Sequence, residues 1–232
     1  ALDTSSTPGS AAVVRDRVIV AECAGEAGCT QGERLPRELM RVLDVAGATL
    51  GDIDQYAVCL GPGSFTGLRV GIATVQGLAH SRAARVVPVT AFEALASSAP
   101  AGPEWVAVWI DAHRGEVFAT LLGPDHCTCV EAPTSLTPAA TLDAWTPSLS
   151  AGRRVRFIGD AAVRHRDVIT ARLGGSAIVD DSAPRLAGIV GKIACADPSR
   201  AVAPHAVAPL YVRRPDAVLD RERAGRAAPS EH

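Results

Sequence analysis

The densest group of residues that could bind a ligand or take part in a reaction is a glycine-rich turn that leads into a predicted helix. It reads Leu60-Gly61-Pro62-Gly63-Ser64-Phe65-Thr66-Gly67-Leu68-Arg69-Val70-Gly71. Backbone N–H groups in such a turn can hold an anion where the helix begins. Alternatively, the glycines satisfy backbone geometry and close packing, since Gly67 and Gly71 lie one helical turn apart. The sequence alone leaves both interpretations open.

Three common chemistries do not fit this turn. The only lysine, Lys192, is distant in the sequence, which excludes a Walker-type phosphate loop and leaves Arg69 as a substitute cation. No acidic residue that could bind a ribose ends the next predicted strand, at residues 86–89, so a nicotinamide cofactor is not expected. Ser64 is not in a GxSxG elbow, which argues against hydrolysis by this serine.

Two aspartates end the first predicted strand of each half of the chain. Asp3 and Asp111 could orient a magnesium ion beside a nucleotide, or they could simply cap the turns that come after them. Phosphates approach a backbone most easily where side chains are absent. The bulky His113 and Arg114 in the second turn therefore argue against a working ATP cradle.

The cysteines and histidines of this sequence lack the spacings of common metal sites. The six cysteines form no CxxC pair, and Cys127-Thr128-Cys129 alone cannot supply four zinc ligands. No two of the six histidines have HxxxH spacing. We therefore predict no metal site and no cofactor, and the cysteine usage indicates a reducing cytoplasm.

Composition indicates an ordinary globular protein. The 232 residues are 47% hydrophobic and 21% charged, and no apolar run approaches the roughly 20 residues of a membrane helix. The net charge of −2 gives no overall positive field for nucleic acid, so contact with RNA is expected to be local or through a partner. The chain begins with Ala1, and its first apolar stretch is short for a central strand, which predicts missing N-terminal residues.

Hydrophobic periodicity predicts the same order of elements twice. The first half has predicted strands at 1–3, 10–14, 18–21, 56–60 and 86–89. Its helices are predicted at 33–46 and 66–82, with a third opened by a capping box of Thr90 and Glu93. The second half has predicted strands at 105–111, 116–122, 127–131, 155–159 and 177–179, and helices at 138–145, 161–174 and 184–195, with Asp160 as a cap.

A doubled βββαβαβα order predicts an α/β fold of two tandem actin-like (RNase H-like) domains that face each other across a cleft. We expect an N-terminal domain at 1–100, which bears the glycine-rich turn, and a smaller second domain with a C-terminal segment at 101–212. Residues 213–232 carry mixed charge and little apolar periodicity, which is typical of a mobile tail.

The predicted helix at 66–82 is apolar nearly all round. Its polar stripe is limited to Arg69, Gln76 and His80, so most of its surface must be covered. Small residues at Ala73 and Gly77, beside Gly71 and Thr74, would let another helix approach closely. This surface either binds a partner or is enclosed within its own domain.

The chain resembles the TsaB (YeaZ) family. The residues that carry the resemblance are Gly61-Pro62-Gly63-Ser64-Phe65-Thr66-Gly67-Leu68-Arg69, supported by Leu2-Asp3-Thr4-Ser5-Ser6, Asp111-Ala112-His113-Arg114-Gly115-Glu116-Val117-Phe118 and Pro209-Leu210-Tyr211-Val212-Arg213. Together these stretches span nearly the whole chain. The resemblance implies a part in making threonylcarbamoyladenosine beside the tRNA anticodon.

The resemblance further implies a non-catalytic assembly subunit. Such a protein pairs with its paralogue TsaD, which transfers threonylcarbamoyl to adenosine, and with the ATPase TsaE, and it also forms homodimers through similar helices. Contact with tRNA would be indirect, and no membrane is involved. The alternative function is an ATP-dependent small-molecule kinase or ATPase of the same architecture that uses Asp3 and Asp111.

These considerations predict three sets of site residues. The residues expected to shape the turn and the partner-binding helix are Gly61, Pro62, Gly63, Ser64, Phe65, Thr66, Gly67, Leu68, Arg69 and Gly71. The expected interface positions are Leu39, Leu43, Val70, Thr74 and Leu78. A vestigial nucleotide site would use Asp3 and Asp111. Gly71→Leu is expected to weaken partner binding while the monomer stays folded.

Overall fold

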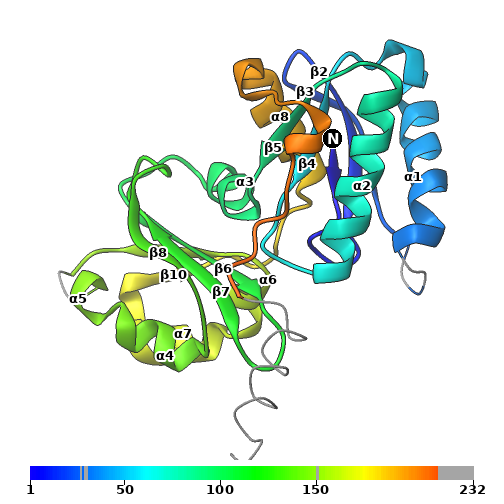
Figure 1. Ribbon diagram of the computed structural model, residues 1–232. Coiled ribbons are helices and arrows are strands. Elements are labelled where there is room, and N and C mark those ends of the chain that lie inside the picture. Colours follow the sequence, from blue (N-terminus) through cyan, green and yellow to red (C-terminus); the bar gives the residue numbers. More distant parts are fainter. Residues whose placement is uncertain (27, 29–30, 150–151, 214–232) are drawn as a thin grey trace, which may run out of the picture.

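The first half of the chain forms a five-stranded mixed sheet (Figure 1). The computed structural model describes residues 1–26, 28, 31–149 and 152–213, so the predicted tail from residue 214 onward lies outside the described residues. The strands are β1 (Leu2–Asp3), β2 (Ser10–Arg15), β3 (Val18–Ala24), β4 (Tyr56–Cys59) and β5 (Val86–Val89), in the order β3-β2-β1-β4-β5. Neighbours β1 to β3 are antiparallel, whereas β4 pairs in parallel with β1 and β5.

The second half repeats this arrangement. Its strands are β6 (Trp105–Asp111), β7 (Val117–Leu122), β8 (Cys129–Leu136), β9 (Val155–Ile158) and β10 (Ala177–Val179), in the order β10-β9-β6-β7-β8. Each sheet therefore places its first strand in the centre, its antiparallel hairpin strands on one side and its parallel strands on the other. The predicted α/β class with two actin-like βββαβαβα units is confirmed.

Helices cover both faces of the first sheet (Figure 1). On one face α1 (Gln31–Ala46) and α2 (Phe65–Ser81) bury a layer that includes Leu35, Ile72 and Val75. On the other face lie α3 (Ala91–Ser98) and α8 (Ala187–Ala196), whose core continues into the second sheet through Ile110 and Phe118. The far face of the second sheet is covered by α4 (Pro138–Ala144), α6 (Asp160–Arg164) and α7 (Arg166–Leu173), and α5 (Thr146–Leu149) comes after α4.

Helix α8 comes after the second sheet in sequence but packs on the first. Gly191 lies against Val14, and the first turn of α8 is capped from the first half of the chain. The amide of Ala187 donates to Ser10 Oγ at 3.1 Å, and the amide of Gly188 donates to Glu22 Oε1 at 2.7 Å. A carboxylate at a helix N-terminus also complements the helix dipole. The last helix thus completes the helical layer of the first sheet.

Residues 197–213, which we call the C-terminal strap, run back over the first half (orange in Figure 1). The strap contains two short 3-10 helices, Pro198–Arg200 and Pro204–Ala206. Val202 forms an antiparallel bridge with Val86 at the edge of β5. The side-chain amide of Gln76 on α2 donates to the carbonyls of Pro204 and Val207. The strap is therefore fixed to both the sheet edge and α2.

Several predicted elements differ in detail from the structure. The predicted helix at 161–174 is divided into α6 and α7 at His165, and β8 continues to Leu136. Thr90 caps α3 as predicted, but the carboxylate of Glu93 pairs with Arg200 of the strap, a residue that short-range patterns cannot reveal. Among the helices of the described ranges, none is long and apolar enough to cross a membrane.

Candidate functional site

The glycines of the turn and α2 form one face that packs on the residues after β1. A Cβ atom added to Gly63 would lie 2.3 Å from Ser5 O, and one added to Gly67 would lie 2.2 Å from Thr4 O. At Gly71 the same atom would lie 2.1 Å from Thr4 Oγ1. Each distance is far below van der Waals contact, so these positions exclude side chains. Two motifs that are distant in sequence therefore meet here.

The polar groups of the turn are used within this contact. Ser64 donates its amide to Ser5 O at 2.8 Å, and Ser64 Oγ caps α2 by accepting from the amide of Gly67 at 3.2 Å. The carbonyl of Gly61 accepts from Ala91 N at 2.7 Å, which ties the turn to α3. The turn therefore fits the close-packing interpretation. Two of the amides that an anion would need, those of Ser64 and Gly67, already have partners.

The carboxylate of Asp3 holds its own turn together. Asp3 is 1% exposed, and its Oδ1 accepts from the amide of Ser5 at 2.9 Å and from Ser5 Oγ at 2.5 Å. Its Oδ2 accepts from Ser6 Oγ at 2.6 Å. Burial raises the pKa of the nearby Cys59 thiol well above its usual range, and the Asp3 carboxylate adds to that effect. Burial and the Asp3 carboxylate thus both favour the neutral form of the Cys59 thiol.

The carboxylate of Asp111 is neutralised by an arginine. Arg164 Nη1 on α6 lies 2.6 Å from Asp111 Oδ2, and the amide of His113 donates to Asp111 Oδ1 at 3.0 Å. The amide of Asp111 itself donates to Asp160 Oδ1. Burial alone would raise the pKa of Asp111, but the His113 amide and the Arg164 guanidinium together hold it below its usual value.

This geometry decides how well a magnesium nucleotide would fit. An ion bound to Asp3 would compete with Ser5 and Ser6 for both carboxylate oxygens, and an ion bound to Asp111 would have to displace Arg164. Both carboxylates instead cap turns, which was the second interpretation of the sequence. In the described part of the chain, no group of three or more His, Cys, Asp and Glu side chains is placed to hold a metal.

The predicted interface positions lie along the seam between α1 and α2. Leu39, Val70, Thr74 and Leu78 are half-buried there, whereas Leu43 is 5% exposed and belongs to the core. The outer surface of α2 carries small residues at the exposed positions Thr66, Ala73 and Gly77, with the exposed Arg69 and His80 beside them. A Cβ atom on Gly77 would meet nothing within 4 Å, in contrast to Gly71. On α1, Met40 is 53% exposed.

A cluster of two aromatic residues and an arginine stands where α2 begins. The rings of Phe65 and Tyr211 stack with centroids 5.2 Å apart, and the Arg69 guanidinium carbon lies 4.0 Å from the centre of the Phe65 ring. Arg69 Nε donates to Tyr211 Oη at 3.0 Å. Sequence reasoning placed Phe65 and Arg69 in the site but missed Tyr211 and Arg164, which join it across long sequence separations. For Tyr211 the only signal was its place in the Pro209-Leu210-Tyr211-Val212-Arg213 stretch.

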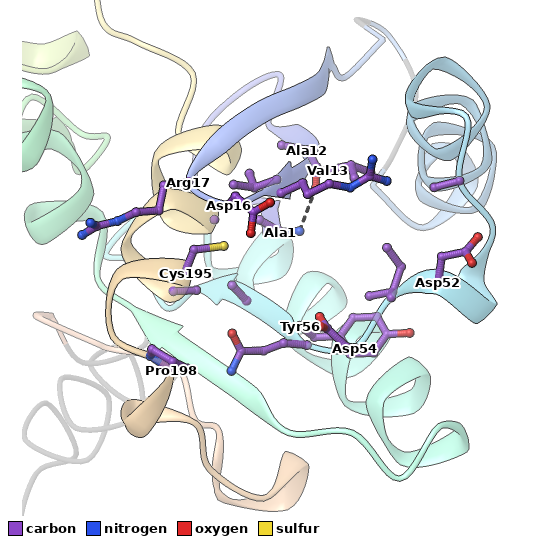
Figure 2. Close-up of a pocket in the computed structure, with 18 residues that line it drawn as sticks. Ala1, Ala12, Val13, Asp16, Arg17, Asp52, Asp54, Tyr56, Cys195 and Pro198 are labelled. Carbon is purple, nitrogen blue, oxygen red and sulfur yellow. Dashed lines mark hydrogen bonds between the residues drawn. The ribbon is translucent and has the colours of Figure 1, made fainter.

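A pocket of about 740 Å³ lies elsewhere, between β2, β4 and α8 (Figure 2). Charged side chains such as Asp16, Arg17 and Asp54 stand around it. The α-amino group of Ala1 donates to Ala12 O at 2.8 Å, and burial lowers its pKa to about 6. We assign this pocket no ligand.

Comparisons with known proteins identify one similar family model and several relatives. The family model for TsaD, tRNA N6-adenosine threonylcarbamoyltransferase, matches residues 27–124. A Mycobacterium tuberculosis protein named as uncharacterized is 30% identical over 94% of this chain and 92% of its own length. The tRNA threonylcarbamoyladenosine biosynthesis protein TsaB of Escherichia coli is 33% identical over 51% of this chain and 52% of its own.

A solved structure covers nearly the whole fold. YeaZ from Pseudomonas aeruginosa superposes with a TM-score of 0.72 at 26% identity, over 90% of this chain and 97% of that one. The sequence similarity thus extends over nearly the full length, and the shared fold includes both halves. This chain belongs to the TsaB (YeaZ) family.

Proposed function

We propose that this protein is a non-catalytic assembly subunit in the biosynthesis of tRNA threonylcarbamoyladenosine, and that it pairs with a TsaD-type paralogue through the outer face of α1 and α2. The observation that carries this proposal is the exposed surface of small residues on α2. Ala73 and Gly77 are exposed on a helix whose other sides are packed, and no described element covers them. A partner helix can approach such a surface closely.

The chain's relation to TsaD supports the choice of partner. The TsaD-type family model spans residues 27–124, which include α1 and α2. A paralogue that shares this helix pair would present an equivalent face, and two related faces can pack about a pseudo-two-fold axis. In this proposal residues 1–100 carry the docking helices, and residues 101–212 support them.

The transfer reaction is assigned to the partner. Asp3 and Asp111, the two carboxylates placed for chemistry, are occupied by Ser5, Ser6 and Arg164. A TsaE-type ATPase would join the assembled pair, tRNA would be reached through the complex, and a homodimer would use the same α1–α2 face. Homodimerisation and pairing with TsaD would then exclude each other.

The test is a calorimetric titration with the TsaD-type partner. Gly77→Arg places a long charged side chain on the proposed face, and arginine is a better helix former than glycine, so the fold should hold. We expect at least tenfold weaker binding. The matched control is Gly175→Arg in the second half, where an added Cβ also meets nothing within 4 Å. Equal binding by both variants would show that α2 is not the docking helix.

The kinase or ATPase alternative has its own measurement. Mg-ATP is titrated into the chain alone, and we expect no saturable heat because both aspartates already have partners. Saturable binding that disappears in Asp3→Asn would favour the alternative function.

A further inference from the structure

Arg69 is held in a fixed orientation at the edge of the proposed docking face. Its guanidinium lies over the Phe65 ring at 4.0 Å, and its Nε donates to Tyr211 Oη at 3.0 Å. The side chain of Arg69 is nevertheless exposed. In the described part of the chain, its two terminal amino groups have neither a hydrogen-bond partner nor a carboxylate beside them. The stacking restrains a side chain that would otherwise lose considerable entropy on binding.

An arginine restrained in this way is suited to one kind of ligand. Its free amino groups form a planar fork that matches a carboxylate or phosphate group in a bidentate manner. The first turn of α2 adds the positive end of the helix dipole beside it. The other charged pair near Tyr211 is Arg213 with Glu116, at 2.9 Å, and it is already neutral as a pair. The local field at Arg69 therefore favours an anion.

We propose that Arg69 binds a carboxylate side chain on a helix of the TsaD-type partner, with Phe65 and Tyr211 as its positioning residues. This inference rests on the proposed function. Arg69, Ala73 and Gly77 recur at four-residue spacing on the exposed side of α2, so a helix packed on the small residues passes beside the guanidinium.

A protein carboxylate fits the surroundings better than an RNA phosphate does. The chain has a net charge of −2, and the neighbours of Arg69 along the exposed side of α2 are Thr66 and Ala73, which are uncharged. A surface that tracks a phosphate backbone needs several cations in a row. One oriented arginine beside a small-residue surface is instead typical of a specific contact between two proteins, where arginine is over-represented.

The experiment measures the affinity of the full chain for the TsaD-type partner at low and high salt. We expect Arg69→Gln to weaken binding by about 10- to 100-fold and to reduce its salt dependence. Arg69→Lys should recover only part of the affinity, because lysine cannot form the bidentate pair. Tyr211→Phe, which removes only the hydroxyl that orients Arg69, should weaken binding by about threefold.

Two controls separate the outcomes. Arg153→Gln alters an arginine that also stacks on an aromatic ring, Trp105 at 4.3 Å, but in the second half of the chain, and should leave binding unchanged. A chain that ends at Arg213 tests whether residues 214–232 supply the carboxylate. If that shorter chain binds as weakly as Arg69→Gln does, the proposal is wrong.

The remaining outcomes are equally decisive. If the wild-type chain does not bind the partner at all, the proposed function fails. If the wild-type chain binds and Arg69→Gln binds equally well, only the role of Arg69 is overturned. If Arg69→Gln keeps its affinity for the partner but loses affinity for tRNA in the assembled complex, the ligand is a phosphate rather than a protein carboxylate.

Discussion

The two halves share a glycine with positive φ after the fourth strand of each sheet, but the segments that come after it differ. Gly61 lies after β4 with φ of 90°, and Gly159 lies after β9 with φ of 114°. A Cβ on Gly159 would lie 2.1 Å from Trp109 O, so its loop must approach the central strand β6. The positive-φ glycine at this point therefore belongs to the shared architecture.

The segments after these two glycines differ. In the first half Gly63, Gly67 and Gly71 continue the close contact along α2, which runs unbroken for 17 residues. In the second half the chain divides into α6 and α7, of 5 and 8 residues, and the core is filled by Trp109, Trp145 and Phe157. The first half thus presents a long helix to solvent, whereas the second half encloses its aromatic residues.

The largest effect should come from the aromatic core of the second half. Phe157 is fully buried, and Phe157→Ala should lower the free energy of unfolding by about 3–5 kcal/mol through lost contacts and a cavity. Phe65→Ala, the same truncation at a residue that is 38% exposed, should cost less than about 1 kcal/mol. Urea unfolding of the wild type and the two variants measures both values. Similar losses would remove the distinction between the halves.

The next largest effect should come from the glycine face. Gly71→Leu would push a side chain into Thr4, so we expect a loss of about 3 kcal/mol in unfolding free energy, measured by urea unfolding. This replaces the sequence-based expectation that the variant stays folded and loses only partner binding. Gly77→Leu is the control on the same helix, where the added atoms meet open space. A stable Gly71→Leu protein would contradict the close contact between α2 and the residues after β1.

Helix caps give a smaller effect that should be equal in the two halves. Ser64 caps α2 through Gly67 N, and Thr137 caps α4 through Ala140 N. Each alanine substitution should lower the free energy of unfolding by about 1 kcal/mol, because one amide at the helix N-terminus loses its partner. Thermal or urea unfolding gives both values. A much larger loss for Ser64→Ala would indicate that the hydroxyl does more than cap.

The smallest effect concerns Arg164. Its side chain is 59% exposed, so Arg164→Gln should reduce the free energy of unfolding at pH 7 by less than about 1 kcal/mol. A carboxyl with a lower pKa in the folded chain stabilises the fold above its unfolded pKa, near 3.8, and this stabilisation is lost as the pH falls through the folded value. The difference between variant and wild type should therefore vanish in acid. A difference that grows in acid would show that Arg164 acts on another group.

Much of the fold could be predicted because its signals are local. The doubled order of strands and helices is set by periodicity, and Thr90 and Thr137 mark helix starts by their own chemistry. The break at His165 was missed because helical propensity continues through it. The position of α8 was also missed, since Ser10 and Glu22, which cap it, lie more than 160 residues away in sequence.

The site was predictable in its residues but not in their partners. The turn and the two aspartates were recognised as motifs, whereas the contacts of Gly71 with Thr4, of Asp111 with Arg164 and of Arg69 with Tyr211 depend on the tertiary fold. Gly71 faces the residues after β1 and Gly77 faces solvent, because the two positions lie on different sides of α2. Sequence spacing indicates such faces, but it does not say which one meets the sheet.

The capping of α8 by Ser10 and Glu22 has a consequence for synthesis on the ribosome. Until Ala187–Ala196 has been translated, the face of the first sheet that this helix covers has no partner, and its apolar strands stay open to solvent. The nascent first half therefore passes through a stage that invites aggregation and chaperone binding. A gene divided between the two sheets would yield fragments that must be expressed together to become soluble.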